Sequence, residues 1–217
     1  MQILSEPPAA RLRELIDDRA IFMPLKVSQY HRMIKDGLLP EGEPYELLGG
    51  YLIRKDRSAM GEDPMTVGHE HAVAISNITD LNPKFRRLGC HVRIQLPVTL
   101  PPYNEPEPDA AIVLGTQKDF TSHHPGATDV ACVIEVADSS LRRDRTSKLQ
   151  IYAGAGIACY IIVNLPDRVV EVYTQPLNRK GHTARYGQLT TLTGRQAVEL
   201  PAAKGKRLSM TARSLLP

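Results

Sequence analysis

The chain lacks any long hydrophobic run: no apolar stretch approaches the roughly 18 residues that a membrane span needs. The first eight residues, Met1 to Pro8, have no basic segment leading into an apolar one, so we expect no secretory signal. Cysteine is scarce, with only Cys90, Cys132 and Cys159, and they form no Cys-x-x-Cys pattern. These absences indicate neither structural zinc nor a disulfide framework. We therefore expect a protein of a reducing compartment, the cytoplasm, with no membrane partner.

Several catalytic and nucleotide-binding motifs are also missing. The chain has no P-loop pattern, no Gly-x-Ser-x-Gly elbow and no Cys/His pairing, so neither a phosphate cradle nor covalent catalysis is predicted. We found no internal repeat or low-complexity tract. The composition is ordinary for a globular protein, with 42% hydrophobic and 24% charged residues over 217 positions. The net charge of +3 is compatible with nucleic acid but does not indicate it.

The hydrophobic pattern predicts an α/β protein. Helical spacing is found at residues 9–18, 26–37, 67–81 and 143–153. We expect Ser28 to be the N-cap and Gly37 the stop of the second helix, a break at Asn82 and Pro83 after the third, and a turn at Gly49 and Gly50. Strand patterns are found at 45–48, 51–53, 91–98, 109–114, 130–137, 158–165 and 168–174, and short β segments follow at 188–193, 196–200 and 207–211. The central order of strand, strand, helix, strand, strand predicts a mixed sheet with a crossover helix and extra C-terminal β segments. We expect a helical extension over residues 1–25 and a single domain over 26–217.

Two acids lie in or beside apolar strands. Asp109 begins the run Pro108 to Leu114, and Glu135 stands inside the apolar segment that begins at Val130. A carboxylate in such a place is unfavourable unless it is paired or binds a metal. If the two strands pair in register, both acids together can bind a hard divalent cation such as Mg²⁺ or Mn²⁺. This arrangement suggests metal-dependent cleavage of a phosphodiester.

The predicted helix that follows these strands in the sequence contains further candidate site residues. Asp144 and Lys148 are four residues apart and share one face, so the acid is placed to orient the amine. Three arginines, Arg142, Arg143 and Arg145, precede the lysine and are candidates for phosphate contacts.

Together with several short segments, these residues make the chain resemble the Uma2 family of endonuclease-like proteins, within the PD-(D/E)XK nuclease superfamily. The matching pieces are short, and their order and spacing carry the resemblance. They are Tyr45–Gly50, Glu70–Asn77, Glu107–Asp109, Glu135–Ser140, Asp144–Ala153 and Gly156–Val163. The resemblance implies a restriction-endonuclease-like mixed sheet flanked by helices, and a divalent-metal nuclease acting on DNA.

The chain departs from the superfamily pattern at one position. The usual acid-x-lysine would place a lysine two residues after Glu135, where this chain has Ala137. The resemblance instead places the lysine at Lys148, on the following helix, and the small Ala137 leaves space for it. Glu46 is a candidate to complete the metal shell or activate water, and His71 is a candidate general acid or a donor that supports a metal ligand.

Each candidate also has a purely structural interpretation. Asp109 is compatible with turn chemistry, Glu135 with a buried salt bridge to an arginine, and Asp144 and Lys148 with a surface ion pair. Glu46 and His71 are compatible with an ordinary hairpin acid and a core histidine, and the arginines with a solvated helix end.

At the level of the whole protein, the alternative is a non-catalytic nucleic-acid-binding or regulatory protein on a nuclease scaffold. A structural dimer whose acids form internal salt bridges is a third hypothesis. Because cutting both strands of a duplex usually requires two active sites, the nuclease hypothesis predicts a homodimer.

Overall fold

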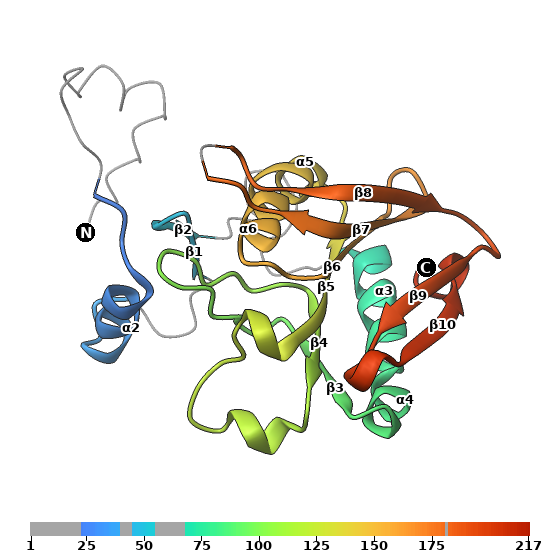
Figure 1. Ribbon diagram of the computed structural model, residues 1–217, viewed down its shortest axis with the longest axis horizontal. Helices are drawn as coiled ribbons and strands as arrows, with labels where there is room; N and C mark the ends of the chain where they lie inside the picture. Colours follow the sequence, from blue (N-terminus) through green and yellow to red (C-terminus); the bar gives the residue numbers. More distant parts are fainter. Residues whose placement is uncertain (1–22, 40–44, 55–67, 181) are drawn as a thin grey trace.

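A computed structural model describes residues 23–39, 45–54, 68–180 and 182–217. Within these ranges the centre of the molecule is a six-stranded sheet with the strand order β3-β4-β5-β6-β7-β8 (Figure 1). Its strands are β3 (Cys90–Ile94), β4 (Ala110–Leu114), β5 (Val130–Ala137), β6 (Cys159–Asn164), β7 (Val169–Leu177) and β8 (Arg185–Leu192). Neighbouring strands are antiparallel except β5 and β6, which run parallel. The predicted α/β class with a mixed sheet is confirmed.

The parallel pair β5 and β6 is joined by a helical crossover. It consists of α5 (Leu141–Arg143), a single π-helical turn η4 (Asp144–Lys148) and α6 (Leu149–Gly154). The predicted helix at 143–153 is therefore present, with a widened central turn. Turns of this kind are rare and are frequent at functional sites.

One face of the sheet is covered by two helices and a C-terminal hairpin (Figure 1). These elements are α3 (His69–Thr79), α4 (Asn82–Arg87), β9 (Ala197–Pro201) and β10 (Arg207–Thr211). Their apolar side chains, among them Ile78, Phe85 and Leu200, are buried against the sheet. The predicted break at Asn82 and Pro83 is present: Pro83 lies in the first turn of α4, where a missing N–H breaks no helical hydrogen bond.

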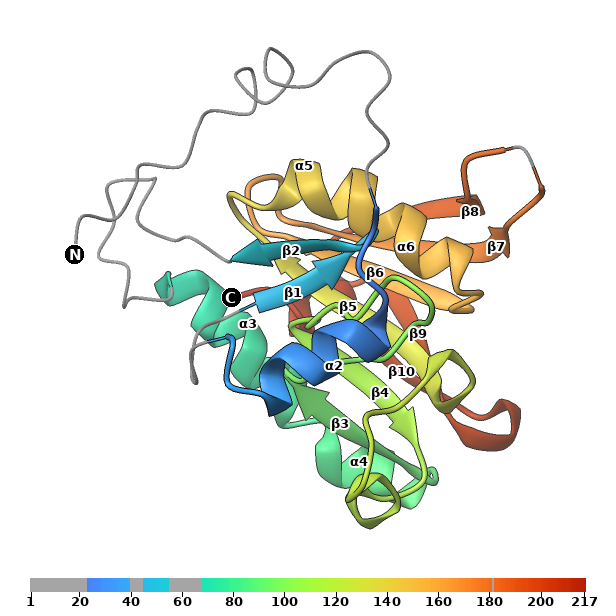
Figure 2. The ribbon, with the colours of Figure 1, turned by 90° about the vertical axis from the view of Figure 1, so that its left-hand side faces the viewer.

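The other face carries the crossover and the N-terminal elements (Figure 2). These elements are α2 (Val27–Lys35), β1 (Tyr45–Leu48) and β2 (Tyr51–Arg54). The predicted Gly-Gly turn between β1 and β2 is present, and Gly49 and Gly50 have φ values of 60° and 81°, which two-residue hairpins favour. Leu47 also bridges to Glu105, in the segment that leads into β4. The hairpin is therefore attached near the start of β4.

Two details predicted from the sequence are wrong, the N-cap of one helix and the end of one strand. Helix α2 begins at Val27 with Lys26 as its N-cap, and the predicted cap Ser28 lies inside the helix. Gln29 accepts a hydrogen bond from the Lys26 N–H at 2.8 Å, so a glutamine takes the place of the expected serine. Strand β3 ends at Ile94 and does not reach residue 98, because Gln95 has a φ of 49° and leaves the extended conformation.

The remaining sequence predictions have different outcomes. The helix predicted at 9–18 lies outside the described residues, and the division of the chain at residue 25 stays a prediction. Gly37, at φ 70°, follows the end of α2 as expected. Among the described helices, none has the length and apolar character to span a membrane.

Candidate active site

The two strand acids lie opposite each other. Because Ala110 of β4 pairs with Ile134 of β5 in an antiparallel ladder, the next positions along it are Asp109 and Glu135. The Asp109 N–H donates to Glu135 Oε2 at 3.3 Å, and the Val136 N–H donates to Asp109 Oδ2 at 2.9 Å. Each carboxylate is therefore held by the backbone of the other acid's strand. These bonds are between strands, so the turn interpretation of Asp109 is not supported.

Lys148 brings an ammonium group to the same place. Its Nζ lies 2.8 Å from Glu135 Oε1 and 3.6 Å from Glu46 Oε2. All three side chains are at most 3% exposed. The alternative of an exposed Asp144–Lys148 pair is wrong, because both residues are buried. Glu135 is indeed ion-paired, but with a lysine and not with the arginine considered above.

Tyr152 is a further residue of the cluster, and it is not among the site residues predicted from the sequence. Its hydroxyl donates to Glu135 Oε1 at 2.8 Å, the oxygen that Lys148 also contacts, and its side chain is fully buried. The available signal was its position four residues after Lys148, one helical turn away on the same face. Two donors thus hold one oxygen of Glu135 in place.

Glu46 reaches the cluster from the hairpin. It lies in β1 and is fully buried, and the Glu107 N–H donates to its Oε2 at 3.4 Å. Segments far apart in sequence, β1 and the stretch before β4, therefore meet at Glu46, which also contacts Lys148.

Asp144 and His71 complete the group of predicted residues. Ser140 Oγ donates to Asp144 Oδ2 at 2.5 Å, whereas the buried Asp144 Oδ1 has no hydrogen-bond partner among the described residues. His71, on α3, places its Nε2 3.3 Å from Asp109 Oδ2. The structure thus brings all six candidate side chains to one end of β4 and β5.

Negative charge is in excess in this cluster. Burial raises the pKa of Glu135 to about 8, and the carboxylates of Asp109, Asp144 and Glu46 add to the rise, which Lys148 opposes. Burial likewise raises the pKa of Asp144, against the opposing effects of Lys148 and Ser140. Four carboxylates therefore surround one ammonium, and a further positive charge would stabilise their ionised forms.

The pKa values of Lys148 and Asp109 are shifted the other way by their neighbours. Burial alone would lower the pKa of Lys148, but Glu135, Glu46 and Asp144 outweigh it and raise the pKa above its ordinary value. Burial alone would raise the pKa of Asp109, but its hydrogen bond with His71 and the charge of that ring hold the pKa below its ordinary value. Lys148 is therefore charged, and Asp109 ionises more readily than Glu135 or Asp144.

The donor set fits an open divalent-cation position. Within the described ranges, no group of three or more His, Cys, Asp or Glu side chains is arranged to hold a metal ion. Asp109 and Glu135 nevertheless supply hard carboxylate oxygens side by side, and Mg²⁺ is commonly held by one or two carboxylates with waters and substrate phosphates. The unpartnered Asp144 Oδ1 is a further oxygen in the cluster. These residues fit Mg²⁺ or Mn²⁺ completed by water and substrate.

The three arginines differ in their surroundings. Arg145 hydrogen-bonds Glu171 through its Nε and Nη2 groups, and its Nη2 lies 3.6 Å from Asp167. Arg142 is exposed, and Arg143 is half-buried, with a buried Nε that has no partner in the described part of the chain. Arg145 is thus engaged at the start of β7, and phosphate contacts by the three arginines stay a prediction.

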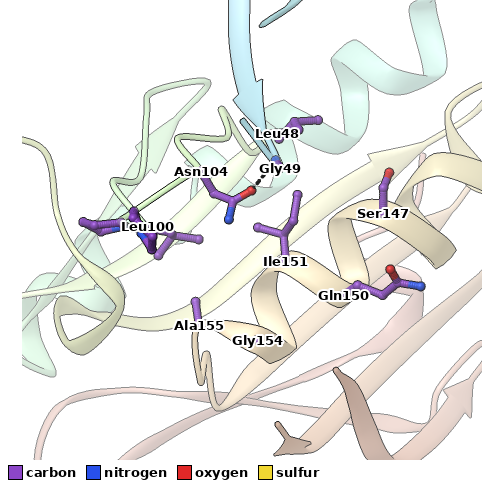
Figure 3. A pocket seen from close by; sticks show the side chains of 11 residues that line it. Leu48, Gly49, Leu100, Asn104, Ser147, Gln150, Ile151, Gly154 and Ala155 are labelled. Atoms are coloured by element: carbon purple, nitrogen blue, oxygen red, sulfur yellow. Dashed lines mark hydrogen bonds between the residues drawn. The ribbon is translucent and has the colours of Figure 1, made fainter. Parts of the chain in front are cut away.

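A cavity of about 440 Å³ lies beside the crossover (Figure 3). It is bounded by Leu48, Leu100, Ile151 and Asn104, whose Oδ1 accepts a hydrogen bond from the Gly49 N–H at 2.6 Å. None of the predicted site residues lines it. The candidate chemistry is therefore at the carboxylate cluster and not in this cavity.

The mixed sheet with its helical crossover is a nuclease-type α/β fold. A solved structure from Anabaena variabilis ATCC 29413, described as "a putative nuclease belonging to DUF820", matches with a TM-score of 0.60 over 88% of this chain and 97% of that chain. At 17% sequence identity, this likeness shows the fold alone. The family model Uma2, described as "Putative restriction endonuclease", matches residues 27–211, so the chain belongs to the Uma2 family. Comparison with curated protein sequences gave no significant match.

Proposed function

We propose that the protein is a Mg²⁺- or Mn²⁺-dependent endonuclease that hydrolyses phosphodiester bonds of DNA. One observation carries the proposal: Asp109 and Glu135 lie opposite each other on adjacent strands, and the Lys148 ammonium contacts the same glutamate. Membership of the Uma2 family, described as "Putative restriction endonuclease", supports nuclease chemistry. The metal requirement and the DNA substrate belong to the proposal.

Asp109 and Glu135 would hold the cation between β4 and β5. When bound, such an ion neutralises phosphate charge and makes water a stronger nucleophile. Lys148 and Tyr152 both donate to Glu135 Oε1, which leaves Oε2 as the oxygen directed toward Asp109. His71 holds Asp109 Oδ2 in the same way. These contacts fix both carboxylates before substrate arrives, and such preorganisation favours catalysis.

Lys148 is placed to stabilise the negative charge that develops on the phosphate. Its ammonium is buried, so its field is screened less than that of a surface lysine. Glu46 and Asp144 keep the pKa of Lys148 high and so keep it protonated. In this scheme Glu46 orients the amine. Asp144 contributes charge and is positioned by Ser140.

We further propose that the protein acts as a homodimer in the cytoplasm. Symmetry supports the dimer, because a duplex has two strands and each chain offers one cluster of this kind. The three free, buried cysteines support a reducing compartment. Light scattering after gel filtration tests the dimer, and a monomer at assay concentration would contradict it.

Nicking of supercoiled plasmid tests the activity. We expect the wild-type protein to nick plasmid with Mg²⁺ or Mn²⁺, and chelation with EDTA to stop the reaction. Asp109→Asn and Glu135→Gln keep the size of each side chain and should abolish nicking. Nicking that survives in the double variant would mean that the site is elsewhere. Salt-dependent DNA binding without any metal-dependent cleavage would favour the non-catalytic alternative.

A further inference from the structure

Arg93 lies on the same face of the sheet as the carboxylate pair. It belongs to the edge strand β3 and pairs with Ala111 of β4, two residues beyond Asp109. The Gln95 N–H donates to the Asp109 carbonyl at 3.1 Å, so the ladder continues to the site. Because side chains alternate along a strand, Arg93 and Asp109 project from the same face, and such diagonal neighbours are roughly 7–8 Å apart.

The guanidinium of Arg93 has almost no partners. Of the five N–H donors of an arginine, one on Nη2 is engaged by a described residue, His124, whose Nδ1 lies 3.3 Å away. The Nε is buried and has no hydrogen-bond partner among the described residues. No described carboxylate lies within ion-pair distance of Arg93.

Other arginines of the chain are paired differently. Arg32 binds Asp36, Arg168 binds Glu70, and Arg145 binds Glu171, each through a hydrogen-bonded ion pair. Burial lowers the pKa of the Arg93 guanidinium, and no carboxylate of the described ranges offsets that effect. A half-buried charge without a counter-ion is unfavourable for folding. Such a residue needs an explanation other than stability.

His124, the partner of Arg93 in the described part of the chain, brings no negative charge. Burial lowers the pKa of His124, and the nearby Arg93 adds to this lowering while Glu105 opposes it. The ring is therefore neutral near pH 7, and its Nδ1 accepts the Arg93 N–H. His124 orients the guanidinium but leaves its charge uncompensated.

We propose that Arg93 binds a backbone phosphate of the nucleic acid, next to the phosphate that lies at Asp109 and Glu135. The planar fork of arginine matches two phosphate oxygens, and an incoming phosphate supplies the missing negative charge. Because Arg93 is a diagonal neighbour on β3, its phosphate contact is separate from Asp109 and Glu135. The two carboxylates therefore stay available to bind the cation. This inference rests on the proposed function, because it assigns a subsite to the same substrate.

The test is DNA binding without cleavage, measured by the fluorescence anisotropy of a short labelled duplex in EDTA over a series of salt concentrations. Arg93→Met keeps much of the apolar stem of the side chain and removes its charge. We expect its affinity to fall about tenfold, as for a charge-assisted hydrogen bond. We also expect the slope of log K against log salt to decrease in magnitude by about 0.9, the value for one phosphate contact.

Two further variants separate charge from geometry. Arg93→Lys keeps the charge and loses the fork, so it should keep the wild-type slope and bind more weakly. Arg32→Met removes an arginine that is exposed and paired with Asp36, so it should change neither slope nor affinity. An equal loss in Arg32→Met would mean that net charge alone matters and would overturn the assignment of Arg93.

Urea unfolding distinguishes binding from a structural role. We expect Arg93→Met to be as stable as the wild type or more stable, because an unpaired buried cation is removed. Lower stability with unchanged slope and affinity would overturn the proposal. If the wild type does not nick plasmid but Arg93→Met still flattens the salt slope, the phosphate subsite holds and the nuclease proposal fails. If the wild type nicks plasmid and Arg93→Met binds normally, only the Arg93 inference fails.

Discussion

Lys148 Nζ contacts Glu135 Oε1 at 2.8 Å, although the two residues come from different elements. The glutamate lies on β5 and the lysine on the π-helical turn that follows it. Ala137, two residues after Glu135 on the same face, is fully buried and has no charge of its own. The amine therefore reaches the site from the helical layer. The Lys148–Glu135 ion pair therefore has two effects: it neutralises buried charge, which stabilises the fold, and it positions the amine at the site.

Removing the amine should destabilise the fold. In Lys148→Met, Glu135 stays buried without the cation it contacts at 2.8 Å, and breaking a buried pair in this way typically costs about 3–5 kcal/mol. We expect a loss near the lower end, about 3 kcal/mol, because a buried glutamate can take up a proton instead of staying charged. Urea denaturation at neutral pH measures the change.

The matched control for this prediction removes both charges. Lys148→Met combined with Glu135→Gln should recover much of the lost stability, because the unpaired carboxylate is gone. If Lys148→Met alone costs less than about 1 kcal/mol, the pair behaves like an exposed salt bridge and the account of a buried cluster is wrong.

Tyr152→Phe should weaken activity more than it weakens folding. The variant loses one hydrogen bond to a carboxylate, worth about 1.5–3 kcal/mol, and frees Glu135 Oε1 to move. We expect a folded protein with a clearly reduced nicking rate. Tyr186→Phe is the control, because its buried hydroxyl donates to the Ile157 carbonyl and not to a carboxylate. Equal activity in the two variants would argue against a positioning role for Tyr152.

Acid stability should depend on Glu171, which lies outside the carboxylate cluster. Burial alone would raise the pKa of Glu171, but hydrogen bonds from Arg145, Tyr173 and Asn164 outweigh it and hold the pKa below its ordinary value of 4.5. A carboxylate with a lowered folded-state pKa stabilises the protein above its unfolded pKa. That stabilisation is lost as the pH falls from about 4.5 through the folded-state pKa.

Glu171→Gln should therefore flatten the dependence of unfolding free energy on pH below about 4.5. Urea denaturation at several acidic pH values measures this dependence. Glu70→Gln is the control, because Glu70 is exposed in its pair with Arg168 and should change the profile little. An unchanged acid profile in Glu171→Gln would show that the network around Arg145 does not contribute.

The sequence predicted the elements whose patterns are regular. Strand β5 is apolar on both faces because it lies at the centre of the sheet, and the register with β4 follows from the pairing of two short apolar runs. The meeting of Asp109 and Glu135 was predicted for that reason. The end of β3 was not, because the residues after Ile94 continue to alternate in sequence while Gln95 turns the chain.

Features set by three-dimensional contacts escaped the sequence analysis. The π-helical turn has no sequence signature here, since Asp144 and Lys148 also fit a regular helix. Tyr152 has no role in the sequence prediction, because only the folded chain places its hydroxyl on Glu135. The alternation of strand β3 places Arg93 on the face opposite Val92, but the sequence does not show which side chains surround its guanidinium.

A calorimetric titration with Mn²⁺ tests the central claim, that Asp109 and Glu135 together bind one divalent cation beside Lys148. We expect the wild type to bind about one ion per chain, as an open site with two carboxylates allows, and Asp109→Asn and Glu135→Gln each to lose that binding while remaining folded. Arg93→Met should bind Mn²⁺ normally. A wild type that binds no Mn²⁺, or carboxylate variants that bind it as well as the wild type, would contradict the claim.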